Sequence, residues 1–164
     1  MNKIKIKINE KLLFGILGVI LIIMIIILSI SLFGTKKMIC TMKSDQSKNG
    51  YILETKYVIK SKKDIVENVD ITQTITSDKK EVLTKFENQF KEQYSYNKKV
   101  YGGYNYKISS NSKRVLSKVD IDYKKFDMQK FIKNNVAMKQ YTKDNKFTLE
   151  GAKKLYSSSG AVCK

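Results

Sequence analysis

The sequence contains no histidine, no tryptophan and no proline among its 164 residues. Without histidine, the chain cannot activate a serine or cysteine nucleophile through an imidazole base, and it lacks a common zinc ligand. Any enzyme built from this chain would have to use carboxylates, lysine or tyrosine for proton transfer. We therefore predict no catalytic residue, no metal site and no cofactor.

Acidic residues are also few, because 15 Asp and Glu face 32 Lys and Arg and give a formal net charge of +17. Arg114 is the only arginine, and lysine, isoleucine, asparagine and tyrosine are abundant. These residues have A/T-rich codons, so part of the positive charge reflects nucleotide composition. The remaining excess favours attraction to polyanions such as phosphate-bearing wall polymers, lipid headgroups or nucleic acid.

One long apolar run stands near the N-terminus, where Leu12 to Phe33 contain no charged residue. A helix of about 20 apolar residues crosses a hydrocarbon core of about 30 Å. Four lysines against one glutamate precede the run, as in the basic start of a signal or signal-anchor sequence. We predict a cytoplasmic segment at 1–11, a single transmembrane helix at 12–33 and an extracytoplasmic domain at 34–164.

Two processing events compete with an uncleaved signal anchor. Small residues at Ser29 and Ser31 have the spacing of a signal peptidase site, but the run is longer than the roughly 7–15 apolar residues of a removed signal. Lipidation of Cys40 would require a small residue before it, whereas Met38 and Ile39 stand there. The anchor is favoured, and cleavage stays open.

Orientation depends on the two cysteines, Cys40 and Cys163, because lysines are equally frequent on both sides of the apolar run. Two cysteines that bracket one domain favour a disulfide, which persists in an oxidising compartment outside the cytoplasm. The alternative is a pair of free thiols buried in a cytosolic domain. We predict the Cys40–Cys163 disulfide and an external domain on a single-pass protein of the cell membrane.

The domain itself shows two kinds of periodicity. Residues 51–60 and 68–76 alternate apolar and polar side chains, which predicts an antiparallel hairpin. Residues 77–94 carry apolar side chains at helical spacing, with Asp78 and Glu81 placed as a capping box.

Alternation then returns at 101–109 and 114–123, with a turn near Asn111, and predicts a second hairpin. Two short helices follow, one after Asp127 and one beginning at Thr148. The expected order is ββαββαα, an α+β domain whose helices cover one face of an antiparallel sheet.

Two phrases in this part resemble a known family. The segment VDIDYKKFDMQKF at 119–131 and the closing segment LEGAKKLYSSSG at 149–160 are similar to the YehR-like family of small secreted bacterial lipoproteins, over roughly residues 50–162. The resemblance implies an extracytoplasmic α+β domain of unknown activity. In place of a lipid anchor, this chain has the apolar run, and it adds Cys163.

Two groups of side chains are candidate sites. Asp120 and Asp122 share one face of a predicted strand, and with Glu54 they are the carboxylates that an enzyme or a Ca²⁺ site would use. Alternating surface charges explain the same residues without chemistry. The second group combines tyrosines and lysines, a composition used to bind single strands or sugars, although tyrosines also fill sheet cores. Its members are Tyr94, Tyr96, Lys98, Lys99, Tyr101, Tyr104 and Tyr106.

These observations favour a non-enzymatic, membrane-anchored domain that binds an anionic envelope polymer or another envelope protein. Two other classes stay open. One is an extracytoplasmic enzyme that uses carboxylates, and the other is a cytoplasmic-facing, basic nucleic-acid-binding protein with the topology reversed. The cysteine pair disfavours nucleic acid as the partner, because it places the domain outside the cytoplasm.

Overall fold

A computed structural model describes residues 34–164 of the chain. The predicted cytoplasmic segment at 1–11 and the predicted transmembrane helix at 12–33 lie outside the described residues, so both stay predictions. Within residues 34–164, no helix is long and apolar enough to cross a bilayer. Thr35–Lys164 form one compact α+β unit.

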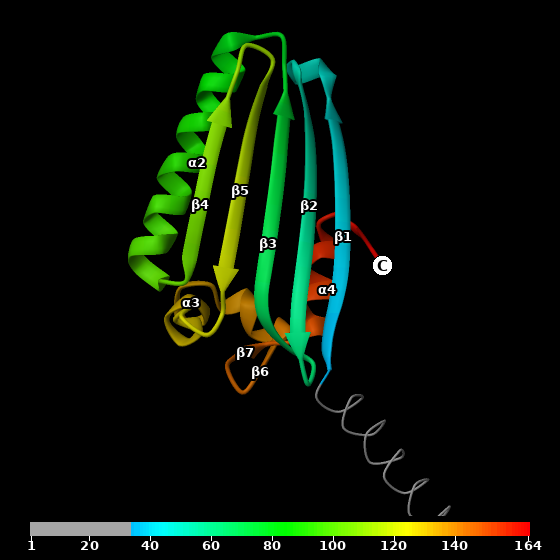
Figure 1. Cartoon of the computed structure of the whole chain (residues 1–164), viewed down its shortest axis with the longest axis vertical. Helices are drawn as coiled ribbons and strands as arrows, with labels where there is room; N and C mark the ends of the chain where they lie inside the picture. The colour runs from blue at the N-terminus through cyan, green and yellow to red at the C-terminus, as the bar shows by residue number, and fades with distance from the viewer. Residues whose placement is uncertain (1–33) are drawn as a thin grey trace, which may run out of the picture. The chain divides into compact units, whose positions relative to one another are not determined.

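The unit is built on a six-stranded antiparallel sheet in the order β4-β5-β3-β2-β1-β8, with the helices on one face (Figure 1). A separate two-stranded hairpin, β6-β7, lies after the second helix. The strands are β1 Thr35–Gln46, β2 Tyr51–Lys62, β3 Ile65–Thr76, β4 Tyr104–Ser110, β5 Arg114–Asp122, β6 Thr142–Lys143, β7 Lys146–Phe147 and β8 Val162–Cys163. The helices are α2 Lys80–Tyr101, α3 Met128–Asn134 and α4 Leu149–Ser158, with 3₁₀ turns at Ser47–Asn49 and Val136–Tyr141.

The first predicted hairpin is confirmed as β2 and β3. Thr55 and Ile59 on β2 and Val69 and Ile75 on β3 point to the helix-covered face and are buried, as their alternation predicts. The strands are joined by a two-residue turn, 63–64, in which both residues have positive φ. Such a turn matches the right-handed twist of paired strands and sets their register.

The predicted order omits one long strand, β1. This strand pairs with β2 over its whole length, from Thr35 opposite Lys62 to Gln46 opposite Tyr51. Three of its 12 residues are β-branched, none is aromatic, and half of them are lysine, serine, aspartate or glutamine, so the sequence of this strand gives only a weak strand signal. Hydrogen bonding to a strong neighbour, β2, compensates for this weak propensity. The short strand β8 was also missed.

The predicted long helix is confirmed as α2, but the predicted capping box is wrong. Lys79 is the N-cap residue, and no side chain caps the helix there. Instead, the buried Ser77 hydroxyl donates to the Gly50 carbonyl at 2.6 Å and accepts from the Lys79 amide at 3.0 Å. Ser77 therefore fixes the entry of the helix, and Asp78 is exposed.

The second hairpin, β4 and β5, and the two short helices are confirmed. Asp127 caps α3 by accepting from the Lys130 amide at 2.9 Å, and Thr148 caps α4 by accepting from the Gly151 amide at 2.9 Å. Gly160 follows α4 with φ of 90° and ends it. These caps agree with the sequence because short polar side chains satisfy the first free amides of a helix.

Both longer helices pack on the same face of the sheet. Leu83 and Phe90 of α2 are buried among residues of β3 and β5, including Ile75 and Val115. On α4, Ala152 and Tyr156 are buried against β1 and β2, and the rings of Tyr156 and Tyr57 stack with centroids 4.1 Å apart. The core is therefore a single layer between the sheet and the helices, and the opposite face of the sheet is uncovered (Figure 1).

Candidate functional site

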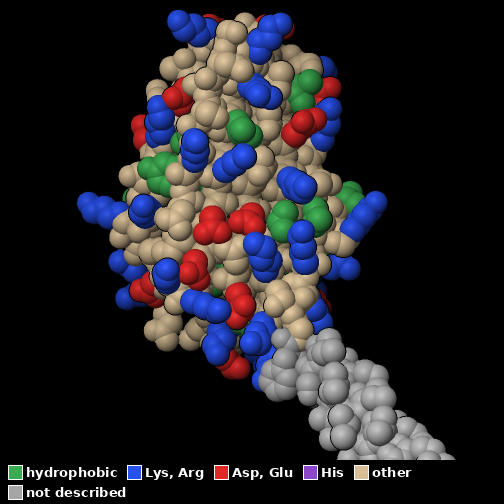
Figure 2. Space-filling view, in the orientation of Figure 1, with side chains coloured by type: hydrophobic (Ala, Val, Ile, Leu, Met, Phe, Trp, Pro, Cys, Tyr) green, Lys and Arg blue, Asp and Glu red, His purple; other side chains and the backbone are tan. Residues whose placement is uncertain are grey.

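The uncovered face of the sheet, which we call the open face, is a broad surface that no helix covers (Figure 1). Figure 2 looks onto it and shows basic side chains spread over the strands, with acidic side chains near its centre. Because side chains alternate along a strand, residues paired across neighbouring strands point to the same face. The register therefore defines which outward side chains lie in one line.

One such line crosses all six strands of the sheet. The pairings that define it run from β8 through β1, β2, β3 and β5 to β4. We call this line the cationic row, because it carries three lysines, two threonines, one valine and no carboxylate. Its members in order are Val162, Thr41, Lys56, Thr72, Lys118 and Lys107.

The three lysines of the cationic row, Lys56, Lys118 and Lys107, are exposed and form no ion pair with any residue in 34–164. Lys118 and Lys107 stand directly opposite one another on β5 and β4. Like charges at opposed positions destabilise a sheet. The row is thus a place where positive charge is concentrated and not compensated by this part of the chain.

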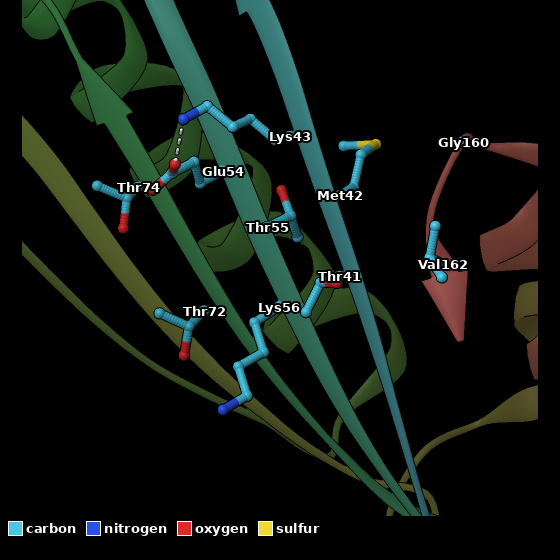
Figure 3. A pocket seen from close by; sticks show the side chains of 10 residues that line it. All are labelled: Thr41, Met42, Lys43, Glu54, Thr55, Lys56, Thr72, Thr74, Gly160 and Val162. Carbon is cyan, nitrogen blue, oxygen red and sulfur yellow. Dashed lines mark ion pairs between the residues drawn. The ribbon is translucent and has the colours of Figure 1, made fainter. Parts of the chain in front are cut away.

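A shallow groove of about 590 Å³ lies over one half of the cationic row. Figure 3 shows its lining, with Lys56 and Thr72 on one side and the ion pair between Lys43 and Glu54, at 3.0 Å, on the other. Val162 of β8 borders the groove at the edge of the sheet. The groove offers hydroxyl and ammonium groups to a ligand, together with apolar surface to which Met42 and Val162 contribute.

Carboxylates occupy the next line of the open face. Asp120 lies opposite Asp70, and its Oδ2 accepts from the side-chain Nδ2 of Asn68 at 2.5 Å. This hydrogen bond is the main cause that lowers the pKa of Asp120, and the positive charge of Lys60 acts in the same direction. Lys60 also pairs with Asp70 at 3.1 Å. Asp120 is therefore held as an anion by its neighbours.

The carboxylates singled out in the sequence do not converge on one cavity. Asp122 accepts from the Lys124 amide at 3.0 Å and pairs with Lys125 at 3.5 Å. Glu54 lines the groove without Asp120 or Asp122. Within residues 34–164, no three acidic or cysteine side chains are grouped as a metal ion would require.

The predicted tyrosine and lysine group is divided between the core and the surface. Tyr94 and Tyr101 are buried, and the Tyr94 hydroxyl donates to the Gln73 side chain. Tyr104 is largely buried, and this burial raises its pKa to about 12. Three members of the group therefore contribute to packing.

The remaining members of that group, Tyr96, Lys98, Lys99 and Tyr106, are exposed. Tyr96 and the two lysines lie on the last turns of α2, whereas Tyr106 lies on β4 and packs its ring against Tyr94 with centroids 5.7 Å apart. The structure thus brings Tyr96, Lys98 and Lys99 onto one helix end, and whether they bind a ligand stays a prediction.

The predicted disulfide is present between Cys40 and Cys163, which are separated by 123 residues. Cys40 is fully buried on β1, and Cys163 pairs with it from β8. The neighbouring residues Ile39 and Lys164 exchange both backbone hydrogen bonds, at 2.9 and 2.8 Å. Cys40 and Cys163 therefore occupy a non-hydrogen-bonded position, where side chains of an antiparallel pair approach most closely.

Comparison with known proteins gives a weak likeness in fold. No protein-family model and no curated protein matches the sequence. An NMR structure of the E. coli YehR protein is similar with a TM-score of 0.51 and 19% identity, over 79% of this chain and 92% of that chain. An NMR structure of a protein from Streptococcus pneumoniae TIGR4 has a TM-score of 0.49 and 14% identity, over 79% and 84%. The resemblance to YehR is therefore supported at the level of the α+β fold.

Sequence reasoning missed the cationic row. The outward positions of Lys56, Lys107 and Lys118 follow from strand alternation in the sequence. Their alignment needs the strand order and the register, because β5 lies beside β3 although α2 and β4 separate them in the chain. The sequence thus indicates that each of these lysines points outward. It does not indicate that they lie in one line, because the strand order cannot be read from it.

Proposed function

We propose that this chain is a member of the YehR-like family whose domain is held at the outer face of the cell membrane by an uncleaved, single-pass signal anchor. The domain acts without catalysis and binds an anionic envelope polymer or another envelope protein. Support for the anchor comes from the uncharged run between Leu12 and Phe33 and the basic residues before it.

The disulfide carries the proposal. It joins Cys40 on the first strand to Cys163 on the last, so a covalent bond links the two ends of the domain. A reducing cytosol does not maintain such a bond. An oxidising location outside the cytoplasm is therefore favoured for residues 34–164. A cytoplasmic nucleic-acid-binding role would require the same two residues to stay reduced.

The arrangement of the carboxylates supports binding over acid–base chemistry. Asp120 is held by Asn68, and Glu54 is paired with Lys43. General acid–base catalysis needs a group whose pKa lies near the working pH and that can reach a substrate proton. The lowered pKa of Asp120 moves this carboxyl away from that condition.

The location can be tested by thiol labelling of intact cells from which the wall has been removed. A membrane-impermeant maleimide should not label the protein before reduction, and it should label Cys163 after an impermeant phosphine reductant opens the disulfide. Cys163 is the better reporter because Cys40 is fully buried. Labelling that needs permeabilised cells and no reductant would place the domain in the cytoplasm and contradict the proposal.

A protease experiment gives an independent control for the same question. Protease added to the same cells should remove the domain, whereas a cytoplasmic marker protein should stay intact. A domain that survives while a known surface protein is cut would show that the orientation is reversed.

A further inference from the structure

The cationic row differs in charge from the lines of side chains on both sides of it. The line below contains Asp70 and Asp120, and the line above contains the paired Lys43 and Glu54. On the row itself, no carboxylate faces the three lysines. An extended ligand with negative charges would therefore meet the fewest repulsive groups along this one line.

The spacing of the lysines fits a chain with several anionic groups better than a single anion. Neighbouring strands lie about 4.8 Å apart, so Lys56 on β2 and Lys118 on β5 are about 10 Å apart at their backbones, with Thr72 between them. Lys107 is one strand further along. A chain of phosphates can place one anionic group beside each of the three lysines, whereas a single phosphate provides one anionic group for all of them.

The remaining groups of the row indicate what kind of chain it is. Thr41 and Thr72 offer hydroxyl groups, which can hydrogen-bond to phosphate oxygens or to alcohol groups. The outward positions of the six strands carry no aromatic residue, because the only aromatic residues of these strands are tyrosines, and their register places them on the helix-covered face. Binding of single-stranded nucleic acid without sequence preference depends on stacking of bases on aromatic rings. A saturated polymer without bases suits this surface better.

We propose that the cationic row binds a linear polymer of phosphodiester-linked polyol units, laid across the strands from β1 to β4. This inference rests on the proposed function, since it names a ligand class for the same extracytoplasmic domain. Phosphate groups of the polymer contact Lys56, Lys118 and Lys107, and they relieve the repulsion between the two opposed lysines on β5 and β4. The groove over Thr41 and Thr72 accommodates the polyol units between phosphates.

The test uses full-length protein in nanodiscs of zwitterionic phosphatidylcholine and a fluorescent poly(glycerol phosphate) as the probe. Affinity is measured at several salt concentrations around 0.1 M, where charges are screened over about 10 Å. The test variant is K56Q/K107Q/K118Q. A matched variant, K80Q/K85Q/K153Q, removes the same charge from exposed lysines on α2 and α4, and K98Q/K99Q removes the exposed lysine pair at the end of α2.

The row variant should lose about tenfold in affinity, the loss expected when several exposed charge pairs are removed together, and its salt dependence should become weaker. The matched variant and K98Q/K99Q should each change the affinity by less than about threefold. Amide signals of Thr41 and Thr72 should shift on titration, which would support contact at the groove. A single-stranded DNA of equal charge should bind more weakly than the polymer.

Several results would overturn the inference. Equal losses in the row and matched variants would show a diffuse charge effect, and a loss confined to K98Q/K99Q would move the site to the end of α2. Preference for the DNA would assign the surface to nucleic acid. None of these results bears on the membrane location, which thiol labelling and proteolysis test independently. Failure of the unaltered protein to bind the polymer would overturn both this inference and the polymer-binding part of the proposed function.

Discussion

Cys40 and Cys163 lie directly opposite each other on β1 and β8, although 123 residues separate them in the chain. The bond closes nearly the whole domain into one covalent loop. Closing so long a loop removes conformational freedom from the unfolded chain, and loss of such a bond costs small extracellular domains about 2–5 kcal/mol.

We therefore expect C163S to lower the free energy of unfolding by about 2–5 kcal/mol. Cys163 is the better site for the change because Cys40 is fully buried, where a serine hydroxyl would add a second cost. Urea unfolding of full-length protein in nonionic detergent, followed by circular dichroism, measures the difference. Reduced unaltered protein should unfold at the same urea concentration as C163S, and an unchanged midpoint in C163S would show that the bond does not stabilise the domain.

Ser77 provides a second prediction, since it links the start of α2 to the β1–β2 connection through the Gly50 carbonyl. S77A should lower the free energy of unfolding by about 1–2 kcal/mol, because two buried hydrogen bonds are lost. D78A is the matched control and should change stability by less than about 0.5 kcal/mol. The same urea experiment compares the free energies of unfolding of the two variants. A larger loss in D78A than in S77A would support the capping box of Asp78 and Glu81.

Gly151 is expected to tolerate no larger residue. A Cβ atom at this position would lie 2.0 Å from the Tyr141 carbonyl oxygen, so α4 would have to move away from the preceding 3₁₀ turn. G151A should destabilise the domain by about 1–3 kcal/mol, despite the higher helix propensity of alanine. Thermal unfolding measures the effect beside K153A on the exposed side of α4, and equal melting temperatures for the two variants would argue against this close packing.

Alkaline pH should unfold the domain through its buried tyrosines. Burial raises the pKa of Tyr104 from 10.0 to about 12, so the folded state holds this proton more tightly than the unfolded state does. The resulting stabilisation is complete below pH 10 and is lost as the pH rises towards 12. A shift of two pKa units corresponds to roughly 2–3 kcal/mol at most.

Ultraviolet absorbance of tyrosinate, recorded together with circular dichroism, tests this expectation. The late tyrosine ionisation should coincide with loss of structure, and Y104F should keep its structure to a higher pH than the unaltered protein. Y96F is the control, because the Tyr96 side chain is 58% exposed. Ionisation of all tyrosines near pH 10 without unfolding would contradict the burial of Tyr104.

The sequence predicts which faces of the strands are buried, because this depends on alternation that each segment carries by itself. Ile59 and Ile75 point inward as predicted. Strand β1 was missed because its lysine-rich sequence has weak intrinsic preference, and it folds as a strand through pairing with β2. The pattern of residues within a segment indicates only the conformation that this segment prefers by itself. Pairing with another strand can override that preference, as it does for β1.

The same distinction explains the candidate sites. The tyrosine and lysine group is contiguous in the sequence, but the turn of α2 points its members in different directions, so that Tyr94 enters the core while Tyr96 faces solvent. The cationic row has the opposite character, since Lys56 and Lys118 are distant in sequence and aligned by the register. Ligand surfaces on a sheet are assembled across strands, and a sequence read along the chain does not display them.

The position of the disulfide on β1 also has a mechanical consequence. A tension that pulls the chain at residue 34 away from the sheet loads β1 at Thr35 and begins to separate it from β2, one residue pair after another. Only Thr35–Ile39 can separate before the load reaches Cys40, where the bond passes it to β8 and α4. Thr41, the β1 member of the cationic row, lies immediately beyond this point, so the surface proposed to hold the polymer keeps its register while the first five residues of the strand yield.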